Sequence, residues 1–291
     1  YADVFAEPET EDVSLECGPT PCFEPVSSLP ELVLSLDLCE NGQSCSLSSF
    51  AVTEDNNILG MDQYENRVVL YSGQDGSILN TYNFEFELEE LAYQDHGTFF
   101  IGHTPRNDRT IYKYNASSGQ LTEILSIRNG MSSYGMEFLD GMLFVGGQYG
   151  GGMHVYLLGQ PNARVVEIYS HITNYDQYHS VYLCTTELGS KYGLFTGRMV
   201  RNEMVLITST GERICSIKPD YEYQSIRCGV VSREGTFYLP GERMIVRYNT
   251  RCEPTGMFPI LDVDYYVSGL DIQNGKLYVH KQNGRFDVFQ I

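Results

Sequence analysis

Two histidines and two glutamates are the residues of this chain best suited to proton-transfer chemistry. A histidine beside a carboxylate can take up and release a proton near neutral pH, as a general acid–base pair must. The chain offers His103 or His179 as the imidazole and Glu89 or Glu242 as the carboxylate. No catalytic motif accompanies them: Gly-X-Ser-X-Gly, His-Glu-X-X-His and a phosphate-binding glycine loop are absent from the sequence. A catalytic role therefore depends on whether the fold brings these side chains together.

The elements that would position such residues recur along the chain as a repeated unit. The stretch Gly135–Tyr156, GMEFLDGMLFVGGQYGGGMHVY, reads as three strands, the first two joined by a tight turn at Asp140-Gly141. In most copies a second turn leads to a short fourth strand. The first turns recur at intervals of about 40 to 50 residues, a period typical of propeller blades. They fall at Asn56-Asn57, His96-Gly97, Asp140-Gly141, Tyr192-Gly193, Glu234-Gly235 and Asn274-Gly275.

The last of these copies ends at Ile291 after its third strand, while an apparently unpaired strand, Leu32–Leu38, precedes the first copy. Pairing the two would close a ring and remove open sheet edges. The repeats resemble blades of six-bladed β-propellers of the NHL and lactonase-like type, with their Asp/Asn-Gly turn, hydrophobic strand and later strand ending in Tyr. Over about residues 30–291, this resemblance implies an all-β, six-bladed β-propeller with four-stranded antiparallel blades. Two features depart from it: the chain has no Trp, and the fourth copy has a longer hairpin at 185–191.

The charge of the chain is strongly negative and unevenly distributed. The formal net charge is -19 over 291 residues, and no Lys or Arg precedes Arg67. We expect residues 1–28 to form an acidic, Pro-containing arm tied down by cystines, and residues 29–291 to form the propeller. Binding to a phosphate backbone requires clustered cations, so nucleic acid and anionic membranes are poor partners. The acidity most simply provides a solvated, solubilising surface, and we expect a monomer.

Cysteine usage indicates an oxidising compartment. The even number of cysteines suggests disulfides, and their spacing does not match a zinc knuckle. Asn115-Ala116-Ser117 is a glycosylation acceptor in a predicted turn, and the chain starts at Tyr1 as though a signal peptide had been cleaved. No apolar run reaches the length of a membrane span. The sequence therefore predicts a secreted, extracellular glycoprotein whose cystines involve Cys17, Cys22, Cys39, Cys45, Cys184, Cys215, Cys228 and Cys252.

The later four cysteines can be placed on the expected blades. Cys184 and Cys228 would fall on the innermost strands of adjacent blades, where a bridge is geometrically reasonable. Cys215 would then pair with Cys252 by exclusion, although connectivity cannot be deduced from sequence.

The loops expected on one face of the ring, here called the top face, are the predicted location of function. Tight turns occupy the opposite, bottom face, whereas the top loops differ from blade to blade, and variable loops on a rigid scaffold commonly carry function. A mouth mixing Tyr, His, Arg and Glu suits a small-molecule site; the plainer reading is the polar rim of a water-filled channel. The candidate ligand-binding residues are Asp62, His103, Arg106, Tyr134, Gln148, Tyr149, Tyr178, His179, Arg198, Glu242, His280 and Lys281.

Two sets of carboxylates bear on a metal site. Lactonase-like propellers hold calcium in the channel with inward Glu, Asn and Asp, which here implies Glu137 and Asp271 but no matching Asn set. Asp262 and Asp264 could help to hold a cation, but solvated loop acids are the simpler interpretation. No cofactor is predicted, and calcium stays an open possibility.

These observations favour a secreted recognition protein that binds a small organic ligand or an extracellular protein on the top face. The alternative is a secreted enzyme, a hydrolase or a luciferase-like oxidoreductase, acting on a small apolar substrate at the channel mouth. A purely structural matrix component is the third possibility.

Overall fold

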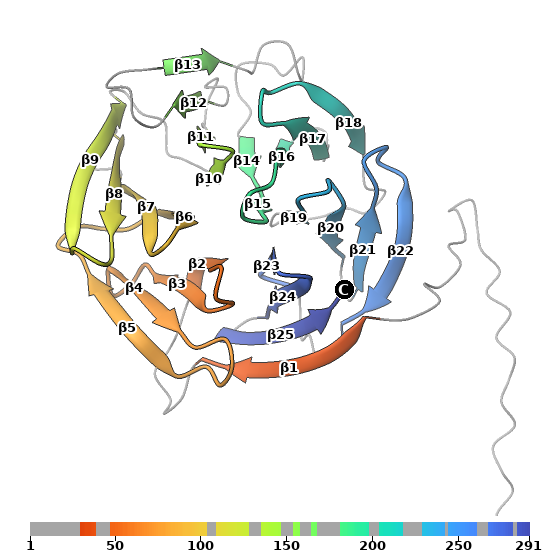
Figure 1. The fold of residues 1–291 in the computed structure, drawn as a ribbon, viewed down its shortest axis with the longest axis horizontal. Helices are drawn as coiled ribbons and strands as arrows, with labels where there is room; N and C mark the ends of the chain where they lie inside the picture. Colours follow the sequence, from red (N-terminus) through yellow and green to blue (C-terminus); the bar gives the residue numbers. More distant parts are fainter. Residues whose placement is uncertain are drawn as a thin grey trace, which may run out of the picture.

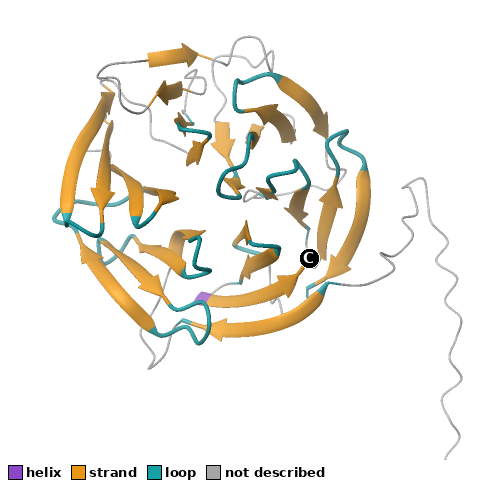
Figure 2. Ribbon diagram, viewed as in Figure 1, coloured by secondary structure: helices purple, strands orange, loops and turns teal. Residues whose placement is uncertain are grey.

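The computed structural model is a ring of six small sheets (Figure 1). It describes residues 30–38, 47–103, 109–127, 135–146, 154–157, 164–167, 181–197, 204–217, 229–241, 244–260, 267–281 and 284–291. Within these ranges the regular structure is β-strand, apart from a single helical-turn residue at Gly284 (Figure 2). The predicted all-β, six-bladed propeller is confirmed.

Each blade is an antiparallel meander with its first strand nearest the axis and its last strand outermost. Blades 1 and 2 contain β2 (Leu47–Val52), β3 (Ile58–Asp62), β4 (Arg67–Tyr71), β5 (Ile78–Asn83), then β6 (Glu90–Asp95), β7 (Thr98–His103), β8 (Arg109–Asn115) and β9 (Gln120–Ile127). Blades 3 and 4 contain β10 (Met136–Leu139), β11 (Met142–Val145), β12 (His154–Leu157), β13 (Arg164–Glu167), then β14 (Val181–Leu183), β16 (Tyr192–Gly197), β17 (Met204–Thr208) and β18 (Arg213–Ile217). Blades 5 and 6 contain β19 (Val230–Val231), β20 (Phe237–Pro240), β21 (Met244–Tyr248), β22 (Pro254–Pro259), then β23 (Gly269–Gln273), β24 (Lys276–His280), β25 (Arg285–Gln290) and β1 (Glu31–Asp37).

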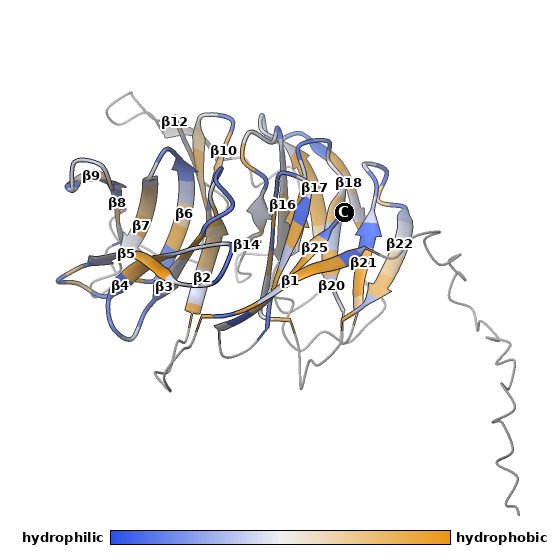
Figure 3. Ribbon diagram, turned by 60° about the horizontal axis from the view of Figure 1, so that its bottom comes forward, coloured by the Kyte–Doolittle hydropathy of each residue, from blue (hydrophilic) through white to orange (hydrophobic). Residues whose placement is uncertain are grey.

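The hydrophobic core lies between neighbouring blades. A middle strand such as β7 is buried on both faces because its blade is covered by a neighbour on each side, whereas the outermost β5 is largely exposed. Seen from the side, hydrophobic colour follows the strands, and the connecting loops are hydrophilic (Figure 3). Burying apolar surface is the main favourable term in folding, so contact between successive blades holds the ring together.

Several of the predicted tight turns have the backbone geometry that suits a twisted hairpin. Asp140 and Gly141 have φ of 48° and 81°, and Asn274 and Gly275 have 51° and 70°. Positive φ at both central residues defines the primed turn, whose twist matches that of the flanking strands. Asn and Asp tolerate this conformation better than most residues with a β-carbon, which explains why they precede the glycine.

The N-terminal strand closes the ring as predicted. β1 pairs antiparallel with β25, with Leu36 opposite Phe286. Leu36 and Leu38 are 5% and 7% exposed and belong to the core cluster between blades 6 and 1. Full burial of a leucine contributes about 1.5–3 kcal/mol, so the closing strand is a substantial part of the stability of the ring.

Blade 4 breaks the regular pattern at its longer first hairpin. After β14, a two-residue strand β15 (Thr185–Thr186) leaves blade 4 and pairs in parallel with β19 of blade 5. The following Leu188 packs against the cluster between blades 1 and 2, on the other side of the axis. The extra residues of this hairpin therefore lie near the axis of the ring, where Figure 1 shows β15.

A disulfide joins blades 4 and 5 at their outer edge. Cys215 on β18 is bonded to Cys252 in the turn before β22, with their Cα atoms 5.8 Å apart, so this predicted pairing is confirmed. Cys184 is buried. Cys17, Cys22, Cys39, Cys45 and Cys228 lie outside the described residues, and the Cys184–Cys228 pairing stays a prediction.

Among the described residues there is also no helix with the length and apolar character needed to cross a bilayer.

Candidate functional site

Most of the residues predicted to line the mouth lie outside the part of the chain that the structure describes. The acid–base candidates His179 and Glu242 are among them, so their roles stay predictions. The full set outside is Arg106, Tyr134, Gln148, Tyr149, Tyr178, His179, Arg198 and Glu242.

Asp62 is placed on the top face but is engaged by its own turn. Its side chain is buried, and Oδ2 accepts hydrogen bonds from Nε and Nη2 of Arg67 at 3.2 and 3.0 Å. Its Oδ1 accepts a bond from the backbone N–H of Glu65 at 3.3 Å. Both carboxylate oxygens thus stabilise the turn between β3 and β4.

His280 and Lys281 contribute to packing and to ring closure. The imidazole of His280 is 5% exposed, and its ring centroid lies 4.7 Å from that of Phe286 and 5.6 Å from that of Phe50. Lys281 forms an ion pair with Asp287, whose Oδ1 accepts a hydrogen bond from Ser35 Oγ of the closing strand at 2.8 Å. Asp287 of β25 therefore binds both Lys281 and the closing strand.

His103 and Glu89 lie together at the top of blade 2. His103 ends β7 and is half-buried, and its Nδ1 donates a hydrogen bond to the Glu87 carbonyl at 2.8 Å. Glu89 is also half-buried, and its backbone N–H donates to the Gly102 carbonyl at 3.0 Å. The bond at Nδ1 leaves Nε2 of His103 as the ring atom available to a ligand.

Beside His103 lies a surface strip that sequence reasoning missed. We define the aromatic strip as Phe84–Glu87 together with His103 and Tyr112. Phe86 lies 5.0 Å from the Tyr112 ring in a stacked arrangement and 4.9 Å from His103. Phe84 lies 5.7 Å from Phe86 and is anchored through its N–H to the Asn66 carbonyl at 2.9 Å. Its signal in the sequence is the alternation FEFELEE, which lies in a linker between two repeats and outside the blade pattern.

The aromatic strip is half-exposed and carries negative charge. Phe84, Phe86, His103 and Tyr112 are each partly buried, whereas Glu85 and Glu87 between them are exposed. Among the described residues, neither glutamate forms an ion pair. The arrangement can therefore offer aromatic faces and carboxylate oxygens to a ligand at once.

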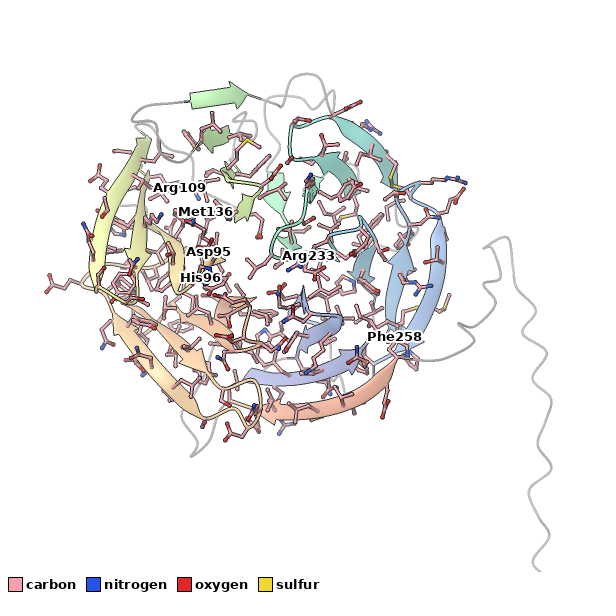
Figure 4. All side chains as sticks on the ribbon, viewed as in Figure 1. Asp95, His96, Arg109, Met136, Arg233 and Phe258 are labelled. Atoms are coloured by element: carbon pink, nitrogen blue, oxygen red, sulfur yellow. A yellow bond between two sulfur atoms is a disulfide. The ribbon has the colours of Figure 1, made fainter. Side chains whose placement is uncertain are left out.

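Carboxylates near the axis link most blades to the next one, a pattern that the repeated sequence motifs do not indicate. In each case a side chain of one blade accepts the backbone N–H of the following blade, at 2.5 to 3.2 Å. Such a bond satisfies a backbone donor of the neighbouring blade and ties the two sheets together. Figure 4 labels His96 and Arg233 near the axis. The pairs are Glu54 with His96, Glu90 with Gly135, Glu137 with Thr186, Glu187 with Arg233, and Asp271 with Val52.

A buried ion pair strengthens the link between blades 2 and 3. Arg109 at the start of β8 contacts Glu90 and donates from Nη1 to the Gly146 carbonyl at 3.2 Å. Burial lowers the pKa of Arg109 to about 9, and the charge of Glu89 opposes this shift. The guanidinium therefore stays charged at neutral pH. Figure 4 shows Arg109 beside Met136 of blade 3.

Glu137 and Asp271 are the axial carboxyls with the most perturbed protonation. Burial raises the pKa of Asp271 well above its ordinary value, and the charge of Glu187 adds to this effect. Burial likewise raises the pKa of Glu137, and the charge of Asp271 raises it further. Asp271 is 3% exposed, and Glu137 is half-buried as a whole residue. Within the described residues no group of three or more His, Cys, Asp or Glu is arranged to hold a metal ion.

Comparison with known proteins gives the fold but no family. No family model matches the chain, and no curated protein matches its sequence. Among solved structures, the calcium-binding protein regucalcin from Agrobacterium tumefaciens is 13% identical, with a TM-score of 0.60 over 88% of this chain and 92% of that chain. A chain of the mitotic checkpoint complex is 9% identical (TM-score 0.59, 94% and 99% covered), and the computationally designed protein Ika8 is 10% identical (TM-score 0.52, 90% and 100% covered). At these identities the likeness shows the propeller fold alone.

Proposed function

We propose that this protein is an extracellular recognition protein that binds a small organic ligand or a partner protein on the top face of its propeller. The observation that carries the proposal is the aromatic strip, in which half-exposed rings and exposed carboxylates share one linker. The linker is fixed to the rigid blades by the bond from Phe84 to Asn66 and the bond from His103 to Glu87. Preorganised groups on a rigid scaffold bind with less loss of conformational entropy.

Two further features support this function. The polar groups near the axis are largely used between blades, whereas Glu85 and Glu87 make no ion pair among the described residues. The Cys215–Cys252 disulfide fits an oxidising compartment such as the extracellular space. A glycan at Asn115 and a monomeric state belong to the same proposal.

An enzyme acting at the axis is the second candidate, and Glu137 favours it. A carboxyl with a raised pKa keeps its proton at a higher pH than an ordinary glutamate, as a general acid must. Its partners Thr186 N–H and Oγ lie 3.2 and 2.9 Å away and hold it in place. The Glu137→Gln variant would then lose turnover of any substrate found, while keeping its fold.

A thermal-shift panel of metabolites and peptides tests the recognition function. A compound at a hundred times its Kd stabilises the folded state by about 2.7 kcal/mol, which raises Tm by several degrees. We expect at least one compound to do so for the wild type and to lose most of the effect in Phe84→Leu/Phe86→Leu. The matched control is Ile78→Ala/Leu79→Ala, on the exposed outer strand β5. Shifts that are equal in all three proteins would refute a site at the aromatic strip.

A further inference from the structure

We propose that the aromatic strip recognises arginine side chains presented by a partner protein. This inference rests on the proposed recognition function and specifies its ligand. The strip combines two groups that favour the same charge: aromatic rings, whose faces attract cations, and carboxylates, which form charge-assisted hydrogen bonds with guanidinium groups.

The geometry gives both groups in one place. Phe86 and Tyr112 are stacked with an interplanar angle of 30°, and His103 lies against the same Phe86 ring at 47°. Phe84 continues the array through Tyr114, 5.5 Å away and nearly perpendicular. Exposed Glu85 and Glu87 alternate with the two phenylalanines along the chain. A planar cation bound at the exposed parts of these rings would lie in the same linker region as the two exposed carboxylates.

The charge of the protein supports a cationic partner. Of the net charge of -19, -14 comes from the residues before Arg67; within the strip as we define it, Glu85 and Glu87 are acidic and His103 is the one basic residue. Among the described residues no Lys or Arg forms an ion pair with Glu85 or Glu87, so their carboxylates are not neutralised by the protein in that part of the chain. Two exposed carboxylates without a Lys or Arg partner among the described residues attract a positively charged group.

Arginine fits this surface better than lysine or a small quaternary ammonium ion. Its guanidinium is planar, stacks on aromatic rings and can donate two parallel hydrogen bonds to one carboxylate. A lysine ammonium is a compact, strongly hydrated charge that gains less from stacking. A quaternary ammonium ion cannot donate hydrogen bonds, so it would leave Glu85 and Glu87 unused.

The test uses three fluorescent peptides that differ at three positions only, carrying arginine, lysine or citrulline between glycines. Citrulline keeps the shape and loses the charge. By fluorescence anisotropy we expect the wild type to bind the arginine peptide at least tenfold more tightly than the citrulline peptide and severalfold more tightly than the lysine peptide. Equal affinity for arginine and citrulline peptides would overturn the inference.

Protein variants locate the binding. Glu85→Gln/Glu87→Gln should weaken the arginine peptide about fivefold, as expected for two exposed charge pairs, and Phe84→Leu/Phe86→Leu should weaken it further. The control Glu123→Gln/Glu212→Gln makes the same change in net charge at exposed sites on β9 and before β18, and should leave affinity nearly unchanged. An equal loss of affinity in both glutamate variants would show a general charge effect and refute the site.

Compounds from the thermal-shift panel that need the phenylalanines but not Glu85 and Glu87 would refute the arginine ligand and leave the recognition function standing.

Discussion

The protonation of Glu137 makes a sharp prediction about how stability depends on pH. Its pKa is raised in the folded ring, first by burial and then by the charge of Asp271. An unfolded glutamate titrates near pH 4.3, so between that value and the folded pKa the native state holds a proton that the unfolded state has released. The contribution of this carboxyl to stability is therefore complete below about pH 4 and is lost as pH rises through the window, at about 1.4 kcal/mol per pH unit.

The substitution Glu137→Gln removes this titration while keeping a carbonyl oxygen that can accept the bonds from Thr186. We expect the plot of unfolding free energy against pH to be shallower for the variant by about 1.4 kcal/mol per pH unit at the start of that window. Urea unfolding at pH 5, 6, 7 and 8 measures it, followed by circular dichroism or tyrosine fluorescence because the chain has no Trp. Glu212→Gln, at an exposed position, is the matched control. Parallel curves for Glu137→Gln and wild type would show that the glutamate is ionised in the folded ring and would refute the reasoning.

Two further predictions concern how the ring is held together. Replacing Cys215 and Cys252 by Ser removes a cross-link between residues 37 apart. The loop-entropy model gives a loss of about 4 kcal/mol in unfolding free energy, which urea unfolding can measure. Adding reductant should lower the stability of the wild type but have little further effect on the variant at this site. Leu36→Ala leaves a cavity between β1 and blade 1, so we expect the unfolding free energy to fall by about 2–5 kcal/mol. Leu32→Ala, on the exposed side of the same strand, should change it little. Similar losses in the two variants would contradict the role given to the closing strand.

The fold could be predicted from the sequence because its signals are local and repeated. Turn pairs such as Asp140-Gly141 require a particular backbone conformation, and the structure shows positive φ at both residues. The closing strand was predicted because alternation at Leu32–Leu38 indicated a strand without a partner, and β25 supplies that partner. The extra residues of blade 4 were noticed as a longer hairpin, but nothing local in Thr185–Thr186 indicates pairing with β19.

The site was harder to predict because it depends on contacts between distant residues. Asp62 and Lys281 occupy loop positions that suit a ligand, yet each is paired with a partner that the sequence does not reveal, Arg67 and Asp287. The aromatic strip lies in a linker, and only the fold brings Phe86 against His103 and Tyr112. In other propellers, too, alternating aromatic and acidic residues in a linker between two repeats can indicate a surface strip of this kind.

The double attachment of blades 4 and 5 has a consequence for how the molecule opens. β15 joins them at the axis and the cystine joins them at the rim, whereas the described parts of the other junctions show neither a strand that crosses between sheets nor a cystine. Local opening follows the least stable contacts. Thermal fluctuations should therefore separate other blades first. The backbone amides of blades 4 and 5 should then exchange their hydrogens most slowly.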